Sequence, residues 1–553
     1  MAAVMEQNTS TQLDMSIKSF DVLIVGAGIS GMYMLYKMRE LGFSTRVLEK
    51  GGGVGGTWYW NRYPGARCDT DTMEYSYSFD EDLQQEWEWP ERYPTQPEIL
   101  RYLEHVADRF ELRTDISFNT RVEAATYDAE TVRWQVRTEH GDTLSAKFLI
   151  MATGCISTPN TPHVDGMDSF TGNIYHTGHW PHEGVDFSGK RVGIIGTGSS
   201  GVQSIPVIAA QAEKLIVFQR TAQYTVPARN RSVDPKFVAE IKADYAGFRA
   251  RNRLQPSGQL SHIPRNDVSA LDVDPEERER IYEERWGWGG FPFYGSFNDI
   301  MLNEEANKTA AEFVRAKIRS IVKDPMMAEK LSPSHTISCK RPVLDSGYLE
   351  TFNRPNVELV DIYEAPIQEI TQNGVRIASD DETTDYDVDC IVFATGFDAM
   401  TGTLLRIDIQ GRDGLTLQEK WSAGPLNYLG LSIPGFPNLF TITGPGSPSV
   451  LTNMIVAIEQ HVEWVADCLD YMRANNHRSI EATVEAQDEW VAHVNATANK
   501  TLYPTCSSWY LGVNIPGKPR VFMPLPGFPP YVEKCEDVVA NGYEGFVLTP
   551  VYD

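Results

Sequence analysis

FDVLIVGAGISGMYMLYKMRELGFSTRVLEKG, residues 20–51, is the stretch that decides the fold of this chain. It opens with a short apolar run typical of a buried strand, and Gly26, Gly28 and Gly31 follow in the spacing GxGxxG. In such a turn the first glycine permits a tight reversal, and the second lets a pyrophosphate approach the backbone. The third allows a helix to pack closely on the strand.

The elements expected after this turn complete a known pattern. Apolar residues recur with helical spacing over residues 32–41, and a strand expected at 45–48 ends on Glu49, 18 residues after Gly31. An acid at this place accepts hydrogen bonds from ribose hydroxyls. The stretch therefore predicts a βαβ unit that binds a dinucleotide with an unphosphorylated ribose, such as FAD.

The same pattern recurs in KRVGIIGTGSSGVQSIPVIAAQAEKLIVFQRT, residues 190–221. Strands are expected at 191–195 and 215–218, on either side of a second GxGxxG turn and a helix. Pro206 is expected in the first turns of that helix, where a missing N–H is best tolerated.

The second unit ends differently from the first. Its second strand leads into Gln219, Arg220 and Thr221 instead of an acid. An arginine can hold a ribose 2′-phosphate with two hydrogen bonds, whereas an acid would repel it, so this unit is expected to prefer NADPH. Two nucleotide units of opposite ribose preference imply hydride transfer from NADPH to a flavin.

Length and charge limit the other possibilities. A chain of 553 residues with 42% hydrophobic residues is expected to form two or three globular domains. The net charge of −26 argues against nucleic acid as a partner, because phosphate binding needs a basic surface. No run of about 18 apolar residues occurs, so no membrane-spanning helix is expected.

The cysteines indicate a reducing, cytoplasmic setting. They are odd in number, scattered, and never arranged as CxxC, which argues against a zinc ribbon and against the paired thiols of a disulfide reductase. The seven are Cys68, Cys155, Cys339, Cys390, Cys468, Cys506 and Cys535.

The predicted fold is α/β, with two Rossmann-like dinucleotide-binding domains, for FAD and NADP, and a helical insertion in the NADP domain. ATG at 152–154 and CIVFATGFD at 390–398 resemble the crossovers between the domains of flavoproteins. The expected bounds are 1–18 for a flexible N-terminal extension, 19–155 and 388–553 for the FAD-binding domain, 156–229 and 336–387 for the NADPH-binding domain, and 230–335 for the insert.

Four helices are expected outside the two nucleotide units. In the insert, Asp274 is expected to cap a helix that has Pro275 at its first position, and apolar spacing predicts another helix over 304–322. Two further helices are expected over 461–472 and 485–498.

A stretch between the two nucleotide units carries a family resemblance. FTGNIYHTGHWP, residues 170–181, resembles the FxGxxxHxxxWP fingerprint of Baeyer–Villiger monooxygenases, which lies at the same place in that family. A second pattern agrees, GxWxxxxYPGxxxD within residues 55–70. The resemblance extends from Asp21 to about Leu548, and SWYLGVNIPGKPR looks most like the phenylacetone monooxygenase branch.

The resemblance implies a flavin monooxygenase with FAD and NADPH as cofactors, a small-molecule ketone and O₂ as substrates, and no metal. NADPH reduces FAD, O₂ adds to give a C4a-peroxyflavin, and a Criegee intermediate rearranges to an ester or lactone. Bulky cyclic or aryl ketones are the expected substrates, with side activity on sulfides. The enzyme is expected in the cytoplasm, without membrane or nucleic-acid partners, as a monomer or weak homo-oligomer.

The resemblance also implies which residues form the site. Arg341 matches the catalytic arginine, and Asp69 matches the acid that orients it; a guanidinium suits the task because it stays protonated. His176 and Trp180 of the fingerprint are expected to hold the linker and not to take part in the chemistry. The implied FAD contacts are Gly26, Gly28, Ser30, Gly31, Glu49, Thr57, Trp58, Arg67, Asp69, Tyr75, Val122 and Met454. The implied NADPH contacts are Thr197, Gly198, Ser199, Ser200, Gly201, Gln203, Arg220, Thr221, Lys340, Arg341 and Trp509.

One departure and two alternatives stay open. The proline-rich stretch 524–530 is expected to stiffen a loop near the pocket, which would change the range of ketones accepted. An N- or S-oxygenating flavin monooxygenase shares both nucleotide motifs, although that class typically lacks the Trp-Pro pair and the long insert. A flavin-binding redox sensor without turnover is the third possibility.

Overall fold

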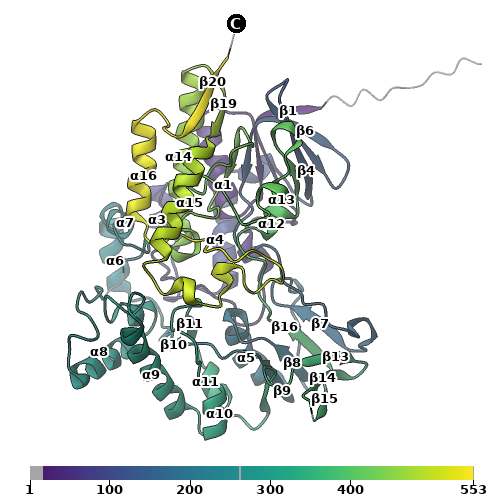
Figure 1. The fold of residues 1–553 in the computed structure, drawn as a ribbon, viewed down its shortest axis with the longest axis vertical. Helices are drawn as coiled ribbons and strands as arrows, with labels where there is room; N and C mark the ends of the chain where they lie inside the picture. Colours follow the sequence, from purple (N-terminus) through teal and green to yellow (C-terminus); the bar gives the residue numbers. More distant parts are fainter. Residues whose placement is uncertain (1–16, 261–262, 381, 552–553) are drawn as a thin grey trace, which may run out of the picture.

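The computed structural model describes residues 17–260, 263–380 and 382–551, which form an upper and a lower α/β part in Figure 1. Most of the expected N-terminal extension lies outside the described residues, and Lys18 already belongs to the first strand. Within the described ranges, every helix is too short or too polar to cross a bilayer.

The upper part is built on an eight-stranded sheet in the order β17-β4-β5-β6-β1-β2-β3, with β18 paired to β6. A Cβ at Gly31 would lie 1.8 Å from the carbonyl oxygen of Gly26, so glycine is required where helix α1 (Ile29–Glu40) leaves the end of β1. The strands are β1 (Lys18–Val25), β2 (Thr45–Leu48), β3 (Ile116–Ser117), β4 (Val122–Asp128), β5 (Arg133–Thr138), β6 (Thr143–Met151), β17 (Asp408–Gln410) and β18 (Leu439–Thr441).

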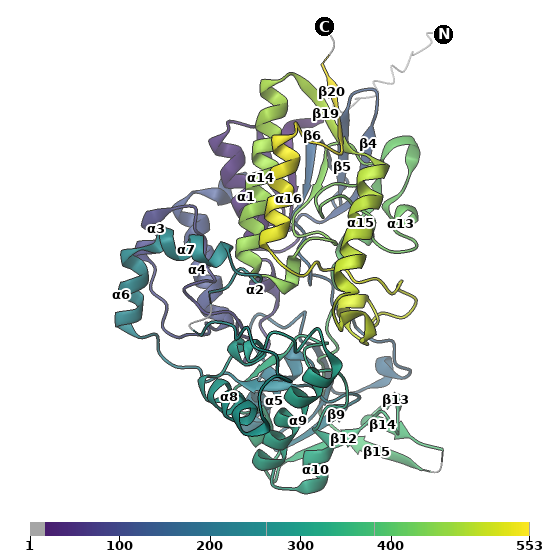
Figure 2. The ribbon, with the colours of Figure 1, turned by 60° about the vertical axis from the view of Figure 1, so that its left-hand side comes forward.

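The C-terminal helices return to cover the first βαβ unit. α14 (Met454–Ala474) lies beside α1, with α16 (Pro529–Ala540) on the other side of α14 and α15 (Val484–Ala498) near it, as Figure 2 shows. The proline-rich stretch is a loop in part: residues 524–528 lie outside helices and strands as expected, but none of 524–530 lines the cavity, and Pro529 and Pro530 form the first turn of α16, where missing N–H groups cost little. The remaining elements of this part are α2 (Thr57–Trp60), α3 (Glu81–Glu86), α4 (Gln96–Arg109), α12 (Gly402–Leu405), α13 (Leu417–Lys420), β19 (His477–Ala482) and β20 (Phe546–Pro550).

The lower part holds a parallel five-stranded sheet in the order β12-β9-β8-β16-β7. Two sequence-based expectations need correction here. β16 pairs with β7 and β8, so the FAD domain cannot begin at 388; the chain leaves this sheet only after Phe393. Pro206 lies inside α5 (Ser199–Gln211), in its interior instead of its first turns. The strands are β7 (Asn173–His176), β8 (Arg191–Ile195), β9 (Lys214–Gln219), β12 (Val357–Asp361) and β16 (Cys390–Phe393).

The insert is helical as expected, but it divides between the two parts. The carboxylate of Asp274 accepts a hydrogen bond from Glu277 N–H at 2.9 Å and caps α8, with Pro275 at the first helical position. Residues 241–248 pack into the core of the upper part, whereas α8 and α9 pack in the lower core. The helices are α6 (Pro235–Ala243), α7 (Tyr245–Arg253), α8 (Pro275–Trp288), α9 (Glu304–Ile321) and α10 (Pro325–Lys330).

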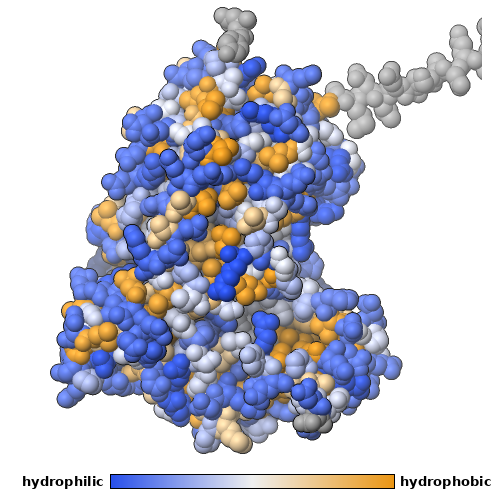
Figure 3. Space-filling model, in the orientation of Figure 1, coloured by the Kyte–Doolittle hydropathy of each residue, from blue (hydrophilic) through white to orange (hydrophobic). Residues whose placement is uncertain are grey.

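Short elements complete the lower part. A helical turn, α11 (Tyr348–Thr351), precedes β12, and an antiparallel three-stranded sheet lies beside the parallel one. These small strands are β10 (Thr225–Pro227) and β11 (Val343–Asp345), which pair with each other, and β13 (Ile367–Thr371), β14 (Gly374–Ala378) and β15 (Thr383–Asp387). The surface in Figure 3 is hollowed between the two parts, on the right-hand side of the view.

Candidate active site

A cavity of about 1530 Å³ lies between the two parts, and both glycine-rich turns open into it. Every residue that the sequence analysis assigns to the site lies in its wall, except Gly31 and Gly201. A Cβ at Gly201 would lie 2.3 Å from the carbonyl oxygen of Gly196, the same clash that Gly31 avoids in the first unit. The third glycines therefore serve helix packing and not ligand contact.

The first turn fits the diphosphate and ribose of a flavin dinucleotide. Gly26 has φ +106°, a conformation that favours glycine, and a Cβ at Gly28 would lie 3.3 Å from Gly56. The Glu49 carboxylate accepts N–H groups of Ala27 and Gly51, each at 2.7 Å. Burial raises the pKa of Glu49, and these two hydrogen bonds act against that rise.

The second turn leaves room for a ligand. A Cβ at Gly198 would meet no atom within 4 Å among the described residues, so packing within the protein does not require this glycine. At the end of β9, Arg220 and Lys340 have no acidic partner in the described ranges. Burial lowers the pKa of Lys340, and the nearby charge of Arg220 lowers it further. An anion such as a ribose 2′-phosphate would relieve this repulsion.

Arg341 joins residues from three segments far apart in the chain. Its guanidinium donates to both carboxylate oxygens of Asp69, at 2.7 and 3.0 Å, and to the carbonyl oxygen of Val450 at 2.7 Å. It also lies 5.5 Å from the ring centre of Phe291 in the insert. Burial alone would lower the pKa of Arg341, but the Asp69 carboxylate outweighs this and raises it. The guanidinium is therefore a permanent cation in the cavity wall, with 27% of its side chain exposed.

The wall on the flavin side is held by bonds that cross between elements. Trp58 Nε1–H donates to the hydroxyl of Tyr75 at 3.1 Å. Gln203 of α5 donates to the backbone carbonyl of Arg67 at 3.1 Å and so connects the two parts beside the cavity. Arg67 itself donates to the carbonyl of Tyr93 at 3.1 Å, which directs its guanidinium toward the protein.

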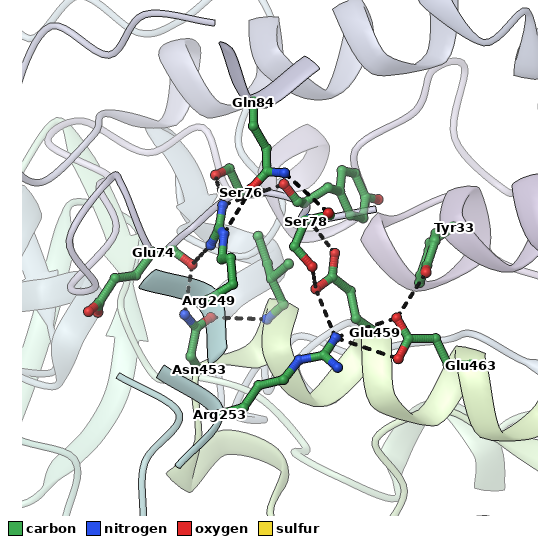
Figure 4. A network of polar contacts seen from close by, with 12 residues as sticks. Tyr33, Glu74, Ser76, Ser78, Gln84, Arg249, Arg253, Asn453, Glu459 and Glu463 are labelled. Carbon is green, nitrogen blue, oxygen red and sulfur yellow. Dashed lines mark hydrogen bonds and ion pairs between the residues drawn. The ribbon is translucent and has the colours of Figure 1, made fainter. Parts of the chain in front are cut away.

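Behind this wall, a polar network connects Glu74, Ser76 and Ser78 to residues of α7 and α14 (Figure 4). Arg249 of α7 donates to the hydroxyl of Ser76 at 2.7 Å and to the carbonyl of Glu74 at 3.2 Å. Asn453, which caps α14, donates to the same carbonyl at 2.8 Å. These residues could not be found from the sequence, because no local pattern marks a contact between positions so far apart in the chain.

His176, the histidine of the fingerprint, lies outside the cavity wall, as expected. Its Nδ1 accepts the N–H of Gly178 at 2.9 Å, and its Nε2 lies 3.3 Å from the carbonyl of Asn160 and 3.2 Å from the hydroxyl of Thr395. Burial lowers the pKa of His176, which favours the neutral ring that these contacts require. Trp180 is buried against Tyr175 and Phe187. Both residues therefore hold the linker.

The structure corrects the interpretation of the cysteines. Cys339 and Cys506 are paired as a disulfide, although they are 167 residues apart in the sequence. Spacing along the chain could not reveal this pair, because only the fold brings the two together. Within the described ranges, no cluster of His, Cys, Asp and Glu could hold a metal ion.

Several polar residues of the cavity wall were not found from the sequence. They carry charge or hydrogen-bonding groups, and among them only Tyr63 belongs to a recognised motif, GxWxxxxYPGxxxD. They are Lys50, Asn61, Tyr63, Thr70, Arg121, Asn160, Gln223, His335 and Arg406.

Comparison with known proteins shows relatives over nearly the full length. A family model described as pyridine nucleotide-disulphide oxidoreductase matches residues 23–270. A Baeyer–Villiger monooxygenase of Pseudooceanicola batsensis is 44% identical, with 96% of each chain covered. A phenazine N-monooxygenase of Lysobacter antibioticus is 42% identical, covering 96% of this chain and 97% of that protein. A solved oxidised steroid monooxygenase bound to NADP is 53% identical with a TM-score of 0.91, covering 97% of this chain and 100% of that one.

Proposed function

Because the chain belongs to the Baeyer–Villiger monooxygenases, flavin enzymes with FAD and NADPH as cofactors, we propose that it uses O₂ to convert ketones into esters or lactones. The proposed substrates are bulky cyclic or aryl ketones, with oxidation of sulfides as a side activity. The 53% identity to an enzyme named for steroids supports this choice.

The observation that carries the proposal is the Arg341–Asp69 pair in the wall of a cavity that both glycine-rich turns share. When bound and reduced by NADPH, FAD would activate O₂, and one oxygen atom of O₂ would be inserted into the ketone. Arg341 would stabilise the negative charge that develops on the carbonyl oxygen as the carbonyl carbon becomes tetrahedral. Asp69 would keep the guanidinium in this place and orientation.

The remaining wall residues are assigned to FAD or to NADPH as the family resemblance implies. Glu49 would accept from the ribose of FAD, whereas Arg220, Thr221 and Lys340 would bind the 2′-phosphate of NADPH. The other proposed FAD contacts are Gly26, Gly28, Ser30, Thr57, Trp58, Arg67, Tyr75, Val122 and Met454. The other proposed NADPH contacts are Thr197, Gly198, Ser199, Ser200, Gln203 and Trp509. We also propose a cytoplasmic location and a monomer or weak homo-oligomer.

Replacing Arg341 tests the function. In the Arg341→Ala variant, NADPH should still bleach the bound flavin, while ester formation from a cyclic ketone falls by about 10²-fold or more. Arg341→Lys should restore only part of the rate, because an ammonium cannot bond both oxygens of Asp69 side by side. Ester formation at the wild-type rate in Arg341→Ala would remove Arg341 from the mechanism.

A second function has support from one relative, the 42% identical phenazine N-monooxygenase. Nitrogen oxidation needs no cation at a carbonyl oxygen, so it should survive Arg341→Ala better than ketone oxidation does. Incubation with a cyclic ketone and an aromatic amine under NADPH, followed by product mass, separates the two. N-oxide formation without any ester would favour the second function.

A further inference from the structure

The disulfide between Cys339 and Cys506 joins two segments at the cofactor cavity. The Cα atoms of the pair lie 5.7 Å apart, and both side chains are buried, with 1% and 3% exposed. The other cysteines, Cys68, Cys155, Cys390, Cys468 and Cys535, are buried free thiols.

The first of these segments carries the two cations of the proposed site. Cys339 directly precedes Lys340 and Arg341, both in the cavity wall. Ser338, on its other side, has φ +67°, a backbone conformation that costs energy for a residue other than glycine. The surrounding contacts must therefore hold this segment in place, and the disulfide is one of them.

The second segment covers the same cavity with little regular structure. Cys506 is followed by Ser507, Ser508 and Trp509, which line the cavity. From 499 to 528 the chain forms only two short 3₁₀ turns, Tyr503–Thr505 and Trp509–Leu511. Tyr510, Leu511, Phe522 and Met523 pack in a buried apolar cluster, whereas Ser507 is exposed and Trp509 half-buried, so the part next to Cys506 is the part that can open locally unless something ties it down.

Several hydrogen bonds of this segment hold its C-terminal half. Lys518 donates to Asp398 and to the carbonyl of Ala399, both at 2.7 Å, and Asn514 donates to the carbonyl of Phe397 at 2.8 Å. These bonds fix that half against residues 397–399. The disulfide adds a covalent tie at the N-terminal half, three residues before Trp509.

We propose that Cys339 and Cys506 are a reversible thiol–disulfide site that sets how tightly the cavity holds NADP(H). In the disulfide form, Ser507–Trp509 is held against the segment of Lys340 and Arg341. In the dithiol form that stretch can move away and release the nucleotide. This inference rests on the proposed assignment of Lys340 and Trp509 to NADPH.

The chemistry of the switch is thiol–disulfide exchange, which takes place when the segment of Cys506 opens locally, because both cysteines are buried in the closed state. With oxidised glutathione, the two cysteine thiols lose two protons and two electrons to form one S–S bond, and glutathione leaves as two thiols. Dithiothreitol reverses the reaction and becomes a cyclic disulfide itself. In a reducing compartment the dithiol form prevails, and the tie forms when the compartment becomes oxidising.

The bond itself is tested by mapping peptides of the holoenzyme. After oxidised glutathione, trypsin and mass spectrometry should find LSPSHTISCK, residues 331–340, joined to TLYPTCSSWYLGVNIPGKPR, residues 501–520. After dithiothreitol the two should appear separately. Failure to find the joined pair after oxidation overturns the proposal.

The effect on the cavity is tested by titrating the holoenzyme with NADP⁺ in both redox states. Oxidised wild-type protein should bind NADP⁺ at least about fivefold more tightly, with slower release, than reduced protein. Cys506→Ser should bind like reduced wild type in both states, and Cys506→Ala serves if the serine variant fails to fold. Cys535→Ala, which removes a distant thiol, should keep the switch.

A disulfide with a purely structural role would behave differently in the same titrations. It would raise the unfolding temperature and leave NADP⁺ affinity unchanged, and that result would overturn the proposal. Ketone oxidation is measured on the same samples. If no ester forms while NADP⁺ affinity still follows the redox state, the proposed reaction fails and the switch stands.

Discussion

The guanidinium of Arg341 is fixed by a carboxylate, a backbone carbonyl and an aromatic ring from separate segments. Of these partners, only Asp69 carries a charge that balances the half-buried cation. The residue is thus held in the cavity wall by a bidentate pair, the geometry that arginine forms and lysine cannot.

Replacing Asp69 by asparagine should separate the position of Arg341 from its charge. We expect ester formation to fall by about 10²-fold, because an amide cannot hold the guanidinium through two charge-assisted bonds. Steady-state rates with a cyclic ketone measure this. Asp71→Asn is the matched control, because Asp71 pairs with Arg92 at 3.3 Å and does not line the cavity. Equal losses in both variants would contradict a specific role for Asp69.

Arg220 should decide between NADPH and NADH. Arg220→Ala removes charge-assisted bonds to a 2′-phosphate, so the KM for NADPH should rise by about 10- to 100-fold, while that for NADH stays unchanged. Flavin reduction with each nucleotide measures the ratio. Lys214→Ala, at the opposite end of β9 and paired with Glu358, should change neither value. A parallel rise for both nucleotides would contradict the assignment.

At the scale of elements, α7 belongs to the insert in sequence but supports the flavin side of the cavity. Arg249 is 8% exposed and donates to groups of residues 74–77, next to Tyr75 in the wall. Burial raises the pKa of Glu74 well above its ordinary value, while Arg249 and Arg92 act against this rise. Polar contacts therefore hold the helix, and losing one of them is costly because the buried group left behind has no other partner.

Removing Arg249 should therefore cost more than removing its neighbour. Arg249→Met leaves several buried acceptors without a donor and should lower the free energy of unfolding by about 3 kcal/mol. Arg251→Met, on the same helix, breaks an exposed pair with Asp244 and should cost less than about 1 kcal/mol. Denaturant titration, with bound flavin recorded in parallel, measures both. Equal costs would show that the network does not stabilise the fold.

At the scale of the whole molecule, His461 couples stability to pH. Its Nδ1 accepts the N–H of Thr443 at 2.8 Å, and its Nε2 lies 2.9 Å from the hydroxyl of Tyr531. That hydroxyl donates to the carbonyl of Leu429, so Nε2 carries the hydrogen of a neutral ring. Burial lowers the pKa of His461 to about 3.

The unfolded chain should therefore bind more protons than the folded one as the pH falls from about 6.5 to 3. The contribution of His461 is complete above pH 6.5 and should weaken by about 3 kcal/mol at pH 4. Glu74 and Glu459, whose pKa values are raised by burial, shift stability in the opposite sense above their unfolded pKa. The measurement is the difference between wild type and His461→Gln at each pH. A constant difference would contradict the buried neutral histidine.

Features that depend on neighbours in the chain could be predicted from the sequence. The two glycine-rich turns, the acid at Glu49 and the cap at Asp274 all lie where spacing placed them, because each is fixed by residues within about 25 positions. The parts of the cavity wall formed by the two glycine-rich turns could be predicted, since both turns present their backbone at the ends of parallel strands. The resemblance to the phenylacetone branch stays a prediction.

Features that depend on residues distant in the chain could not be predicted from the sequence. β16 joined the second sheet because it pairs with β7 and β8, a choice of hydrogen-bond partner that its own apolar run does not reveal. Pro529 and Pro530 began a helix because α16 had a place to pack beside α14. The propensity of a short segment for helix or strand is weak. Where that propensity allows more than one conformation, tertiary packing decides between them.

The sequence by itself determined two nucleotide units of opposite ribose preference, with a cation and an acid for the site between them. Only the tertiary structure decided that Arg341 meets Asp69, that Arg249 supports the cavity wall, and that Cys339 meets Cys506. The physical reason is the separation along the chain between the residues that come into contact. Turns and helices arise from contacts a few residues apart, whereas these pairs form only when packing closes loops of more than about 150 residues.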